Sequence, residues 1–342
     1  MTQSNWWSRL FSPADSARPP EPEPIHRNAL LSVRVASSEA VAEGIRAFEL
    51  VLEDGDRLPP FTAGAHIDVE LPDLSRRQYS LYNAQTDDRC YRIAVLRDPK
   101  SRGGSRFMHD HVQPGDWLRI SPPRNHFGLV AGQSRARLIA GGIGITPILS
   151  MAQALHAQKT PFVLTYAARD RQRMAFADFL HDAPFAQNCR LHLDDEIGRP
   201  LDLVSLLSQP ALGEHLYVCG PAGLIKTCLY VAKRLGWPDT ACHREHFSNT
   251  LTPSIDRPFR ITLKRSGRTI LVPAGKSALK ALIEAGVDVP SSCEEGTCGT
   301  CVTRVLAGDA EHRDVYLTDA ERKTHFTPCC SRARSDELVV DL

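Results

Sequence analysis

Four cysteines near the C-terminus have the spacing of ligands to an iron–sulfur cluster. They are Cys293, Cys298, Cys301 and Cys329, in the pattern C-x4-C-x2-C…C. Cysteines at this spacing hold the [2Fe-2S] cluster of plant-type ferredoxins. Gly296 and Gly299 lie among the first three, and glycine lets the backbone bend and turn its N–H groups toward anionic sulfur. The spacing therefore predicts electron transfer as the chemistry of this segment.

Zinc is the alternative metal for these cysteines. Structural zinc sites usually pair their cysteines in two short C-x2-C knuckles, and the sequence has one such pair, Cys298 and Cys301. The pattern therefore favours iron and sulfide over zinc. The fourth ligand is open between Cys329 and its neighbour Cys330, because only one of two adjacent cysteines can comfortably complete the set. We select Cys329.

A short glycine segment, Arg102-Gly103-Gly104-Ser105, has the residue types of an anion site. We expect a helix to begin here with Ser105 as its N-cap. Free N–H groups and the helix dipole favour an anion at such an end, and a mononucleotide phosphate would fit. A glycine turn that only caps the helix is an equally open alternative on this segment alone.

Two further glycine segments stand at the ends of expected strands. One is Gly141-Gly142-Ile143-Gly144-Ile145-Thr146-Pro147, before an amphipathic helix that Thr146 could cap. The other is Cys219-Gly220-Pro221-Ala222-Gly223. Glycines permit close backbone approach to a pyrophosphate, and ligands of open α/β sheets bind at the carboxyl ends of strands. The two segments together predict a dinucleotide site, although Pro147 replaces the third glycine of the full fingerprint.

The elements that must position these residues fall into three patterns. Short apolar strands at 30–39, 45–53, 65–72, 78–83, 91–98 and 117–123 predict an antiparallel barrel. From residue 135, strands alternate with helices, which predicts βαβ units on a parallel sheet. From residue 259, a hairpin turning at Ser266-Gly267 precedes a helix at 277–286, the cysteine loop and a closing strand at 337–342. This last order fits a β-grasp domain.

The bulk composition narrows the class of protein. The chain has 342 residues, of which 42% are hydrophobic and 24% charged, and its net charge is +1. This length predicts two or three domains, and the small net charge argues against a nucleic-acid partner. The sequence has no run of eighteen apolar residues and no signal-peptide pattern, so we expect no membrane association. Ten cysteines with a metal-type cluster indicate a reducing compartment, and we expect a cytoplasmic monomer.

Taken in order, these segments resemble the phthalate dioxygenase reductase family, which includes the vanillate demethylase oxidoreductases. The resemblance extends from about Ala29 to Leu342. It rests on Arg77-Gln78-Tyr79-Ser80-Leu81, Arg102-Gly103-Gly104-Ser105, Pro123-Arg124-Asn125-His126-Phe127, Gly141 to Pro147, Cys219-Gly220-Pro221, Glu245-His246-Phe247, Ser291-Ser292-Cys293 through Cys301, and Cys329-Cys330-Ser331-Arg332-Ala333. The cysteine loop is the most specific of these runs.

The resemblance implies three domains. They are an antiparallel β-barrel flavin domain that binds FMN, an α/β parallel-sheet nucleotide domain of the ferredoxin-reductase type, and a C-terminal β-grasp [2Fe-2S] ferredoxin domain. We place them at 28–132, 133–248 and 257–342, with a flexible tail at 1–27 and a linker at 249–256. The expected phosphate site favours FMN over FAD.

The resemblance also implies roles for single residues. Thr146 should approach the flavin N5, Phe247 should pack near the isoalloxazine, and Cys219 should lie by the nicotinamide, which makes these three the candidate catalytic residues. The residues expected to line the flavin or hold its phosphate are Arg77, Gln78, Tyr79, Ser80, Arg102, Gly103, Gly104 and Ser105. The remaining cofactor-binding candidates are Gly141, Gly142, Gly144, Ile145, Arg169, Gly220, Pro221 and Glu245.

The family pattern bears on the fourth cluster ligand as well. In the family this ligand opens a Cys-Val-Ser-Arg-Ala run. Aligned to that run, Cys329 takes the ligand position and Cys330 takes the valine position. Cys330 is a departure from the family pattern, as is the long N-terminal tail.

The implied function is that of the reductase component of a two-component Rieske non-haem iron oxygenase, of the aromatic ring-hydroxylating or O-demethylase type. NADH gives up two electrons as a hydride and a cluster accepts one at a time, so FMN is expected to convert between them. The oxygenase should dock transiently on the ferredoxin domain. Arg169, Arg171 and Arg173 could meet the 2′-phosphate of NADPH, but the family favours NADH. Two alternatives are a reductase for another acceptor such as a cytochrome P450, and a zinc-bearing regulatory or binding subunit.

Overall fold

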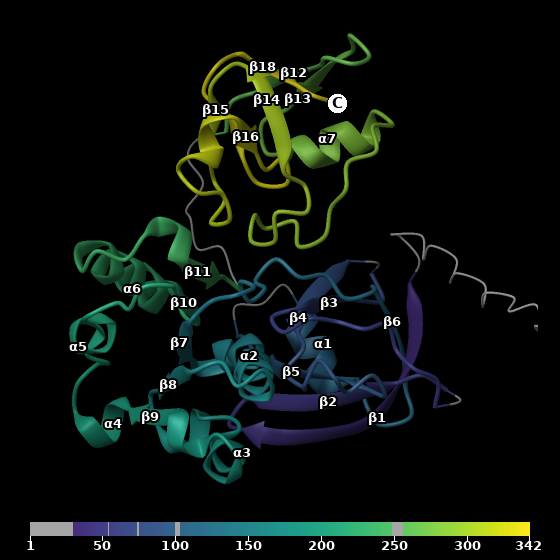
Figure 1. Cartoon of the computed structure of the whole chain (residues 1–342). Coiled ribbons are helices and arrows are strands. Elements are labelled where there is room, and N and C mark those ends of the chain that lie inside the picture. Colours follow the sequence, from purple (N-terminus) through teal and green to yellow (C-terminus); the bar gives the residue numbers. More distant parts are fainter. Residues whose placement is uncertain (1–29, 54, 74, 100–102, 248–255) are drawn as a thin grey trace, which may run out of the picture.

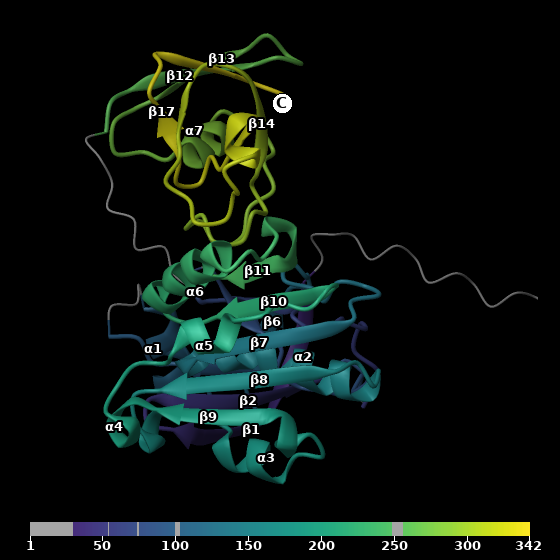
Figure 2. The same cartoon turned by 60° about the vertical axis from the view of Figure 1, so that its left-hand side comes forward.

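The computed structural model describes residues 30–53, 55–73, 75–99, 103–247 and 256–342. Three large sheets follow one another along the chain, and a two-stranded sheet lies beside the third in the sequence. The unit that holds these last two sheets lies above the other two units (Figure 1). The view in Figure 2 shows the same stacking from a second direction. The expected tail at 1–27, Arg102, and residues 249–255 of the expected linker lie outside the described residues.

Six antiparallel strands form the first sheet. They are β1 (Leu31–Ala42), β2 (Ile45–Val51), β3 (His66–Glu70), β4 (Arg76–Ser80), β5 (Tyr91–Leu96) and β6 (Trp117–Ile120). Their order is β4-β3-β6-β1-β2-β5, and a bridge between Leu81 and Ile93 joins the end of β4 to β5. Inward side chains such as Val33 and Ile67 are fully buried, which contributes about 1.5–3 kcal/mol each. The predicted antiparallel barrel is confirmed.

The second sheet is parallel and carries most of the helices. Its elements are β7 (Arg135–Gly141), α2 (Ile145–Ala157), β8 (Phe162–Ala168), α3 (Ala177–Asp182), β9 (Cys189–Leu193), α4 (Asp194–Ile197), α5 (Leu203–Leu207), β10 (Glu214–Cys219), α6 (Ala222–Arg234) and β11 (Cys242–Glu245). The strand order β11-β10-β7-β8-β9 confirms the predicted α/β architecture. Strand β11 and helix α5 were not predicted. Strand β11 is a short edge strand made mostly of polar residues, and α5 has only five residues, which is little more than one helical turn.

Helix α2 joins the barrel to the parallel sheet. Ten of its thirteen residues are buried, because the sheet covers one side of the helix and the barrel covers the other (Figure 1). Two polar side chains of α2 bond to the barrel backbone: Ser150 Oγ donates to Asn83 O over 3.0 Å, and Gln153 Nε2 donates to Tyr82 O over 2.7 Å. These contacts fix the carboxyl end of β7 beside strand β4.

The third unit has the strand order of a β-grasp fold. Its elements are β12 (Phe259–Leu263), β13 (Thr269–Val272), α7 (Ala278–Glu284), β14 (Thr303–Ala307), β15 (Ala310–Glu311), β16 (His325–Phe326), β17 (Arg332–Ala333) and β18 (Glu337–Val340). Strands β12 and β13 form the predicted hairpin, and the closing strand β18 lies parallel to β12. Ser277 caps α7 by accepting a hydrogen bond from Lys280 N. Apolar residues of α7 and these strands form the core.

Among the described residues, no helix has both the length and the apolar character needed to cross a bilayer.

Candidate functional site

The four predicted cysteines come together at one end of the third unit. Cys293, Cys298 and Cys301 lie on the loop between α7 and β14, and Cys329 follows β16. All four are buried, with exposures of 4–8%. Hydrogen bonds from Cys298 and Cys329 hold the pKa of the Cys293 thiol below its usual range, and Cys329 also contacts Cys301. Four buried thiols linked by three successive contacts, from Cys298 through Cys293 and Cys329 to Cys301, form a donor set that fits a small iron–sulfur core.

Backbone N–H groups of the cysteine loop point at sulfur. Glu295 N donates to Cys293 Sγ, and Thr300 N donates to Cys298 Sγ, each over 3.4 Å. Gly296 and Gly299 both have a φ of +74°, the left-handed conformation that favours glycine. The loop therefore offers the anionic cluster the N–H donors that the sequence predicted.

Cys330 adjoins the thiol set through its neighbour Cys329, whose thiol it contacts. Its sulfur is 3.3 Å from Thr327 Oγ1, and a Cβ built at Gly296 would come within 2.4 Å of it. Cys329, in contrast, reaches both Cys293 and Cys301. The two adjacent cysteines therefore have different neighbours.

The glycine segment at 103–105 begins a helix two residues earlier than predicted. Helix α1 (Gly104–Asp110) has Gly103 as its N-cap, with a φ of +104°. The prediction that Ser105 caps this helix is wrong, because its Oγ instead accepts a hydrogen bond from Asp98 N over 3.2 Å. The Arg77 side chain crosses the helix start: a Cβ at Gly104 would meet Arg77 Cγ at 2.6 Å. The expected phosphate segment and the cation of β4 therefore lie together.

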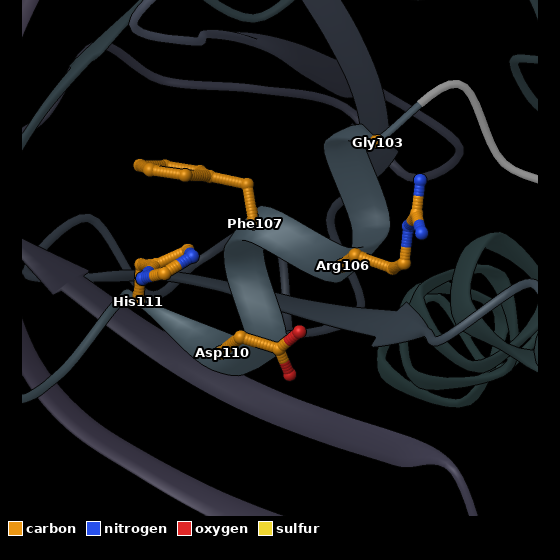
Figure 3. A pocket seen from close by; sticks show the side chains of 5 residues that line it. All are labelled: Gly103, Arg106, Phe107, Asp110 and His111. Carbon is orange, nitrogen blue, oxygen red and sulfur yellow. The ribbon is translucent and has the colours of Figure 1, made fainter.

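An open pocket of about 340 Å³ runs along helix α1. It is lined by Gly103, Arg106, Phe107, Asp110 and His111. Figure 3 shows the rings of Phe107 and His111 on one side of the helix and Arg106 on another. The two ring centroids are 5.7 Å apart. Arg106, Phe107 and His111 were not among the predicted site residues, although each is one or two helical turns from the glycines.

The two glycine-bearing strand ends of the parallel sheet touch each other. A Cβ at Gly144 would come within 2.4 Å of Cys219 O, and one at Gly220 would come within 3.0 Å of Gly141. Glycine is therefore required by packing at these positions. Gly142 and Ile145 lie on the same turn, Gly142 at the start of a short 3-10 helix and Ile145 as the first residue of α2, while Pro221 is the N-cap of α6.

Thr146 does not cap α2 as predicted. The helix already begins at Ile145, and Thr146 Oγ1 donates to Ile143 O over 3.1 Å. Thr146 is 1% exposed, so its hydroxyl lies inside the junction between the parallel sheet and the barrel. Phe247 is 40% exposed at the end of the described part of this unit.

Cys219, Glu245 and Ser80 meet where the barrel contacts the parallel sheet. Cys219 and Glu245 are partners in the register of β10 and β11, and Ser80 Oγ donates to Glu245 Oε2 over 3.3 Å. Burial raises the pKa of Glu245 to about 8, although the bond from Ser80 partly offsets this. Burial also raises the pKa of the Cys219 thiol, with a smaller contribution from Glu245. Both groups are therefore largely neutral at pH 7.

The arginines after β8 differ in their partners. Arg171 Nη2 is 2.7 Å from Asp178 Oδ1, and Arg173 Nη2 is 2.8 Å from Glu43 Oε2. Arg169 is exposed, and its carbonyl accepts a hydrogen bond from Asp195 N over 3.1 Å.

Gln78 faces the third unit, away from its neighbours on β4. Its Nε2 lies 2.9 Å from Ser292 Oγ, 3.2 Å from Asp68 Oδ1 and 3.1 Å from His66 Nε2. Ser292 immediately precedes Cys293. Sequence reasoning did not find Asp68 or His66, although the alternation of His66, Asp68 and Glu70 along an otherwise apolar strand marks a polar face.

Two family patterns match the chain. The 2Fe-2S iron-sulfur cluster binding domain matches residues 261–334, and the oxidoreductase NAD-binding domain matches residues 138–229. The predicted [2Fe-2S] cluster and NAD(P)H binding are thereby confirmed.

Comparison with individual proteins extends these matches over most of the chain. Vanillate O-demethylase oxidoreductase of Pseudomonas sp. (strain HR199) is 46% identical over 317 residues, which are 92% of this chain and all of that protein. A solved phthalate dioxygenase reductase, described as a modular structure for electron transfer from pyridine nucleotides to [2Fe-2S], is 41% identical and superposes with a TM-score of 0.72. That match covers 92% of this chain and 98% of the other.

A third match is part of a larger enzyme. An intact type IV self-sufficient cytochrome P450 monooxygenase is 39% identical with a TM-score of 0.79, over 92% of this chain but 41% of that one. The expected resemblance is confirmed by relatives that align over 92% of this chain and over nearly all of their own length. The chain therefore belongs to the family of phthalate dioxygenase reductase and vanillate O-demethylase oxidoreductase, and it is an NAD(P)H-dependent oxidoreductase with a flavin domain and a [2Fe-2S] domain.

Proposed function

We propose that this protein is the reductase component of a two-component Rieske non-haem iron oxygenase, and that it passes electrons from NADH through FMN and a [2Fe-2S] cluster to that oxygenase. The names of the similar reductases support an oxygenase partner. One observation carries the proposal: the cysteine loop contacts β4, the strand expected to line the flavin, through Ser292 and Gln78. Two electron carriers held at one junction can exchange electrons inside a single molecule.

The flavin is FMN, bound by the barrel. Gly103 and Gly104 lie at the start of helix α1, and the Arg77 side chain lies over the same turn. A terminal phosphate here would accept hydrogen bonds from the backbone and a charge-assisted bond from the guanidinium. Tyr79 follows Arg77 on the same face of β4 and would pack along the isoalloxazine.

The nicotinamide would enter where the two glycine strand ends meet, beside Thr146, Cys219 and Phe247. When bound, FMN supplies the conversion between hydride transfer and single-electron transfer. The chain contributes position and a dry environment: the neutral Cys219 thiol adds no charge next to the reacting rings. Glu245, with its pKa raised to about 8, holds a proton next to Ser80 Oγ at neutral pH.

NADH is the proposed donor rather than NADPH. Two of the three arginines that could have bound a 2′-phosphate, Arg171 and Arg173, already pair with carboxylates. Arg169 is left as a candidate contact to the adenosine ribose. A ratio of kcat/KM for NADH over NADPH well above one is the expected result.

Cys293, Cys298, Cys301 and Cys329 are the proposed cluster ligands, because Cys329 reaches two of the other three. We further propose that the three domains span residues 28–132, 133–248 and 257–342. The oxygenase would dock on the third of these domains.

Anaerobic stopped-flow reduction by NADH tests the proposal. The purified protein should contain FMN, iron and sulfide, and flavin absorbance should bleach before that of the cluster. The reduced protein should then transfer electrons to a Rieske oxygenase from the same cell. The P450 match supports one competing acceptor, and reduction of a P450 but not of a Rieske oxygenase would decide against our assignment. A zinc-bearing, colourless protein would exclude electron transfer altogether.

A further inference from the structure

Three side chains, the buried Asp68 and Ser292 and the half-buried Gln78, join the cysteine loop to the barrel. Ser292 Oγ donates to Asp68 Oδ1 over 2.7 Å and accepts from Gln78 Nε2 over 2.9 Å. Gln78 Nε2 also lies 3.2 Å from Asp68 Oδ1. Ser292 is 7% exposed and Asp68 is fully buried. The Ser292 hydroxyl thus both donates and accepts a hydrogen bond with residues of the barrel. Ser292 is the residue immediately before the proposed ligand Cys293.

Asp68 is held in place independently of the cysteine loop. Arg124 Nη2 lies 2.7 Å from Asp68 Oδ2, and Asp68 N donates to Ser121 Oγ over 2.9 Å. Asp68 and Gln78 are also register partners on β3 and β4. Arg124 supplies the buried Asp68 carboxylate with a cationic partner and helps to orient it toward Ser292. The barrel side of the contact is therefore preorganised.

Strand β4 gives this contact its relation to the flavin. Side chains alternate across a strand, so Arg77 and Tyr79 face one side of β4 while Gln78, between them, faces the other. Arg77 reaches the start of α1, where we place the FMN phosphate, and Gln78 reaches Ser292. One strand therefore positions both the flavin site and the residue next to the cluster.

A second contact between the same parts is looser. Tyr316, in the third unit, packs edge-on to His126 with ring centroids 6.2 Å apart, and Arg244 Nη2 lies 3.4 Å from Tyr316 O. The hydrogen bond from Arg244 is long, and the two rings make no hydrogen bond, whereas Ser292 Oγ lies 2.7 Å from Asp68 Oδ1. They add packing, whereas the buried hydrogen bonds define the register of the loop on the barrel.

We propose that Asp68, Gln78 and Ser292 form a latch that holds the cysteine loop against strand β4, and that this latch sets the rate of electron transfer from FMN to the cluster. The inference deepens the proposed function and rests on it. Each transfer moves one electron from reduced FMN to the oxidised cluster, NADH being the source of the pair, and no bond forms or breaks. The three residues are positioning residues, since none of them supplies or accepts the electron.

Ser292→Ala tests the latch, because it removes both hydrogen bonds of the hydroxyl and leaves Asp68 paired with Arg124. The ratio of latched to unlatched protein should fall about tenfold, the factor that corresponds to about 1.4 kcal/mol. In stopped flow, cluster reduction should slow by up to that factor, because its rate follows the latched fraction, while flavin reduction by NADH is unchanged. Reduction potentials of both cofactors should also be unchanged, and hydrogen exchange should speed up at both 66–80 and 291–301.

Ser331→Ala is the matched control. Ser331 is fully buried and lies two residues after Cys329, but its hydroxyl bonds to Thr327 Oγ1 over 2.8 Å and to Arg313 N over 3.1 Å, all within the third unit. This variant should leave exchange at 66–80 and the rate of cluster reduction as in the wild type. Gln78→Met is a second test variant, because it breaks the latch from the barrel side without touching the third unit. It should reproduce the slowing even if Ser292→Ala loses its cluster.

Two results would overturn the latch. One is an unchanged rate of cluster reduction in both Ser292→Ala and Gln78→Met with full cofactor content. The other is a shifted cluster potential in Ser292→Ala that accounts for the slower rate, since Ser292 would then tune the cluster directly. A wild-type protein in which NADH reduces neither cofactor would remove the proposed function instead. In that case hydrogen exchange alone tests the latch. Amide protection at 66–80 that is the same in Ser292→Ala as in the wild type would overturn it.

Discussion

The ring of Tyr316 lies directly against Gly299 of the cysteine loop. A Cβ built at Gly299 would come within 2.2 Å of Tyr316 Cε1 and Cζ. The same residue has a φ of +74°, so glycine is required there both by conformation and by space. Tyr316 therefore fixes the path of the loop between Cys298 and Cys301, two of the proposed ligands.

Gly299→Ala should consequently abolish most of the cluster. The added methyl must displace either the Tyr316 ring or the loop, and we expect iron and sulfide per protein to fall well below those of the wild type. Gly286→Ala is the control, because Gly286 has a φ of +75° but no atom within 4 Å of the built Cβ. It should keep its cluster and lose about 1–2 kcal/mol of stability from the left-handed conformation alone. Equal iron contents in the two variants would contradict this explanation.

Replacing the two adjacent cysteines separately should give opposite results. Cys329→Ser should lose the cluster, because Cys329 contacts Cys293 and Cys301. Cys330→Ser should retain it, because the Cys330 sulfur faces Thr327 and Gly296 instead. Iron analysis and the visible spectrum distinguish the variants, and a bleached Cys330→Ser protein would reverse the assignment of the fourth ligand.

Arg77→Ala should weaken FMN binding far more than Arg76→Ala does. The Arg77 side chain crosses Gly104 at the expected phosphate site, whereas the Arg76 guanidinium lies 3.5 Å from Glu70. Loss of a charge-assisted hydrogen bond should raise the Kd for FMN about 10–100-fold. Fluorescence titration of the flavin-free protein measures both constants. A similar Kd in the two variants would place the phosphate elsewhere.

Glu245 should make the protein less stable as pH rises. Burial lifts the pKa of this carboxyl from 4.5 to about 8, so between these values the folded state binds more protons than the unfolded state. The free energy of unfolding must then fall with increasing pH across this window and level off above it. Glu245→Gln should remove that part of the pH dependence in thermal unfolding scans. Ser80→Ala should extend the decrease in stability to higher pH, because the Ser80 hydroxyl lowers the pKa of Glu245. An identical pH profile in the wild type and both variants would show that Glu245 does not titrate in this way.

Much of the fold could be predicted because its signals are local. The period-two strands of the barrel, the alternation of strands and helices after residue 135 and the hairpin at Ser266-Gly267 each depend on residues close together in the chain. The cysteine spacing is also local for three of the four thiols. The starts of helices were less predictable. Ser105 and Thr146 can both cap a helix, but Ser105 bonds to Asp98 N and Thr146 to Ile143 O, and a glycine is the N-cap of each helix instead.

The contacts that sequence reasoning missed join segments that are distant in the chain. Gln78 and Ser292 are separated by 214 positions, and Asp68 and Ser292 by 224. No periodicity or motif reports that a glutamine on one strand will meet a serine of another unit. Strand β11 is a similar case, since its four residues form a strand only because β10 offers an unpaired edge.

Strand β4 can accept substitutions far more readily than changes in length. Arg77 and Tyr79, the proposed flavin residues, lie on one face, and Gln78, which contacts Ser292 of the cysteine loop, lies on the other. Inserting or deleting one residue would exchange the faces of everything beyond that point, so the arginine, the tyrosine and the glutamine could not all keep their targets. Among homologous reductases, we therefore expect this five-residue segment to be free of gaps even where its side chains diverge.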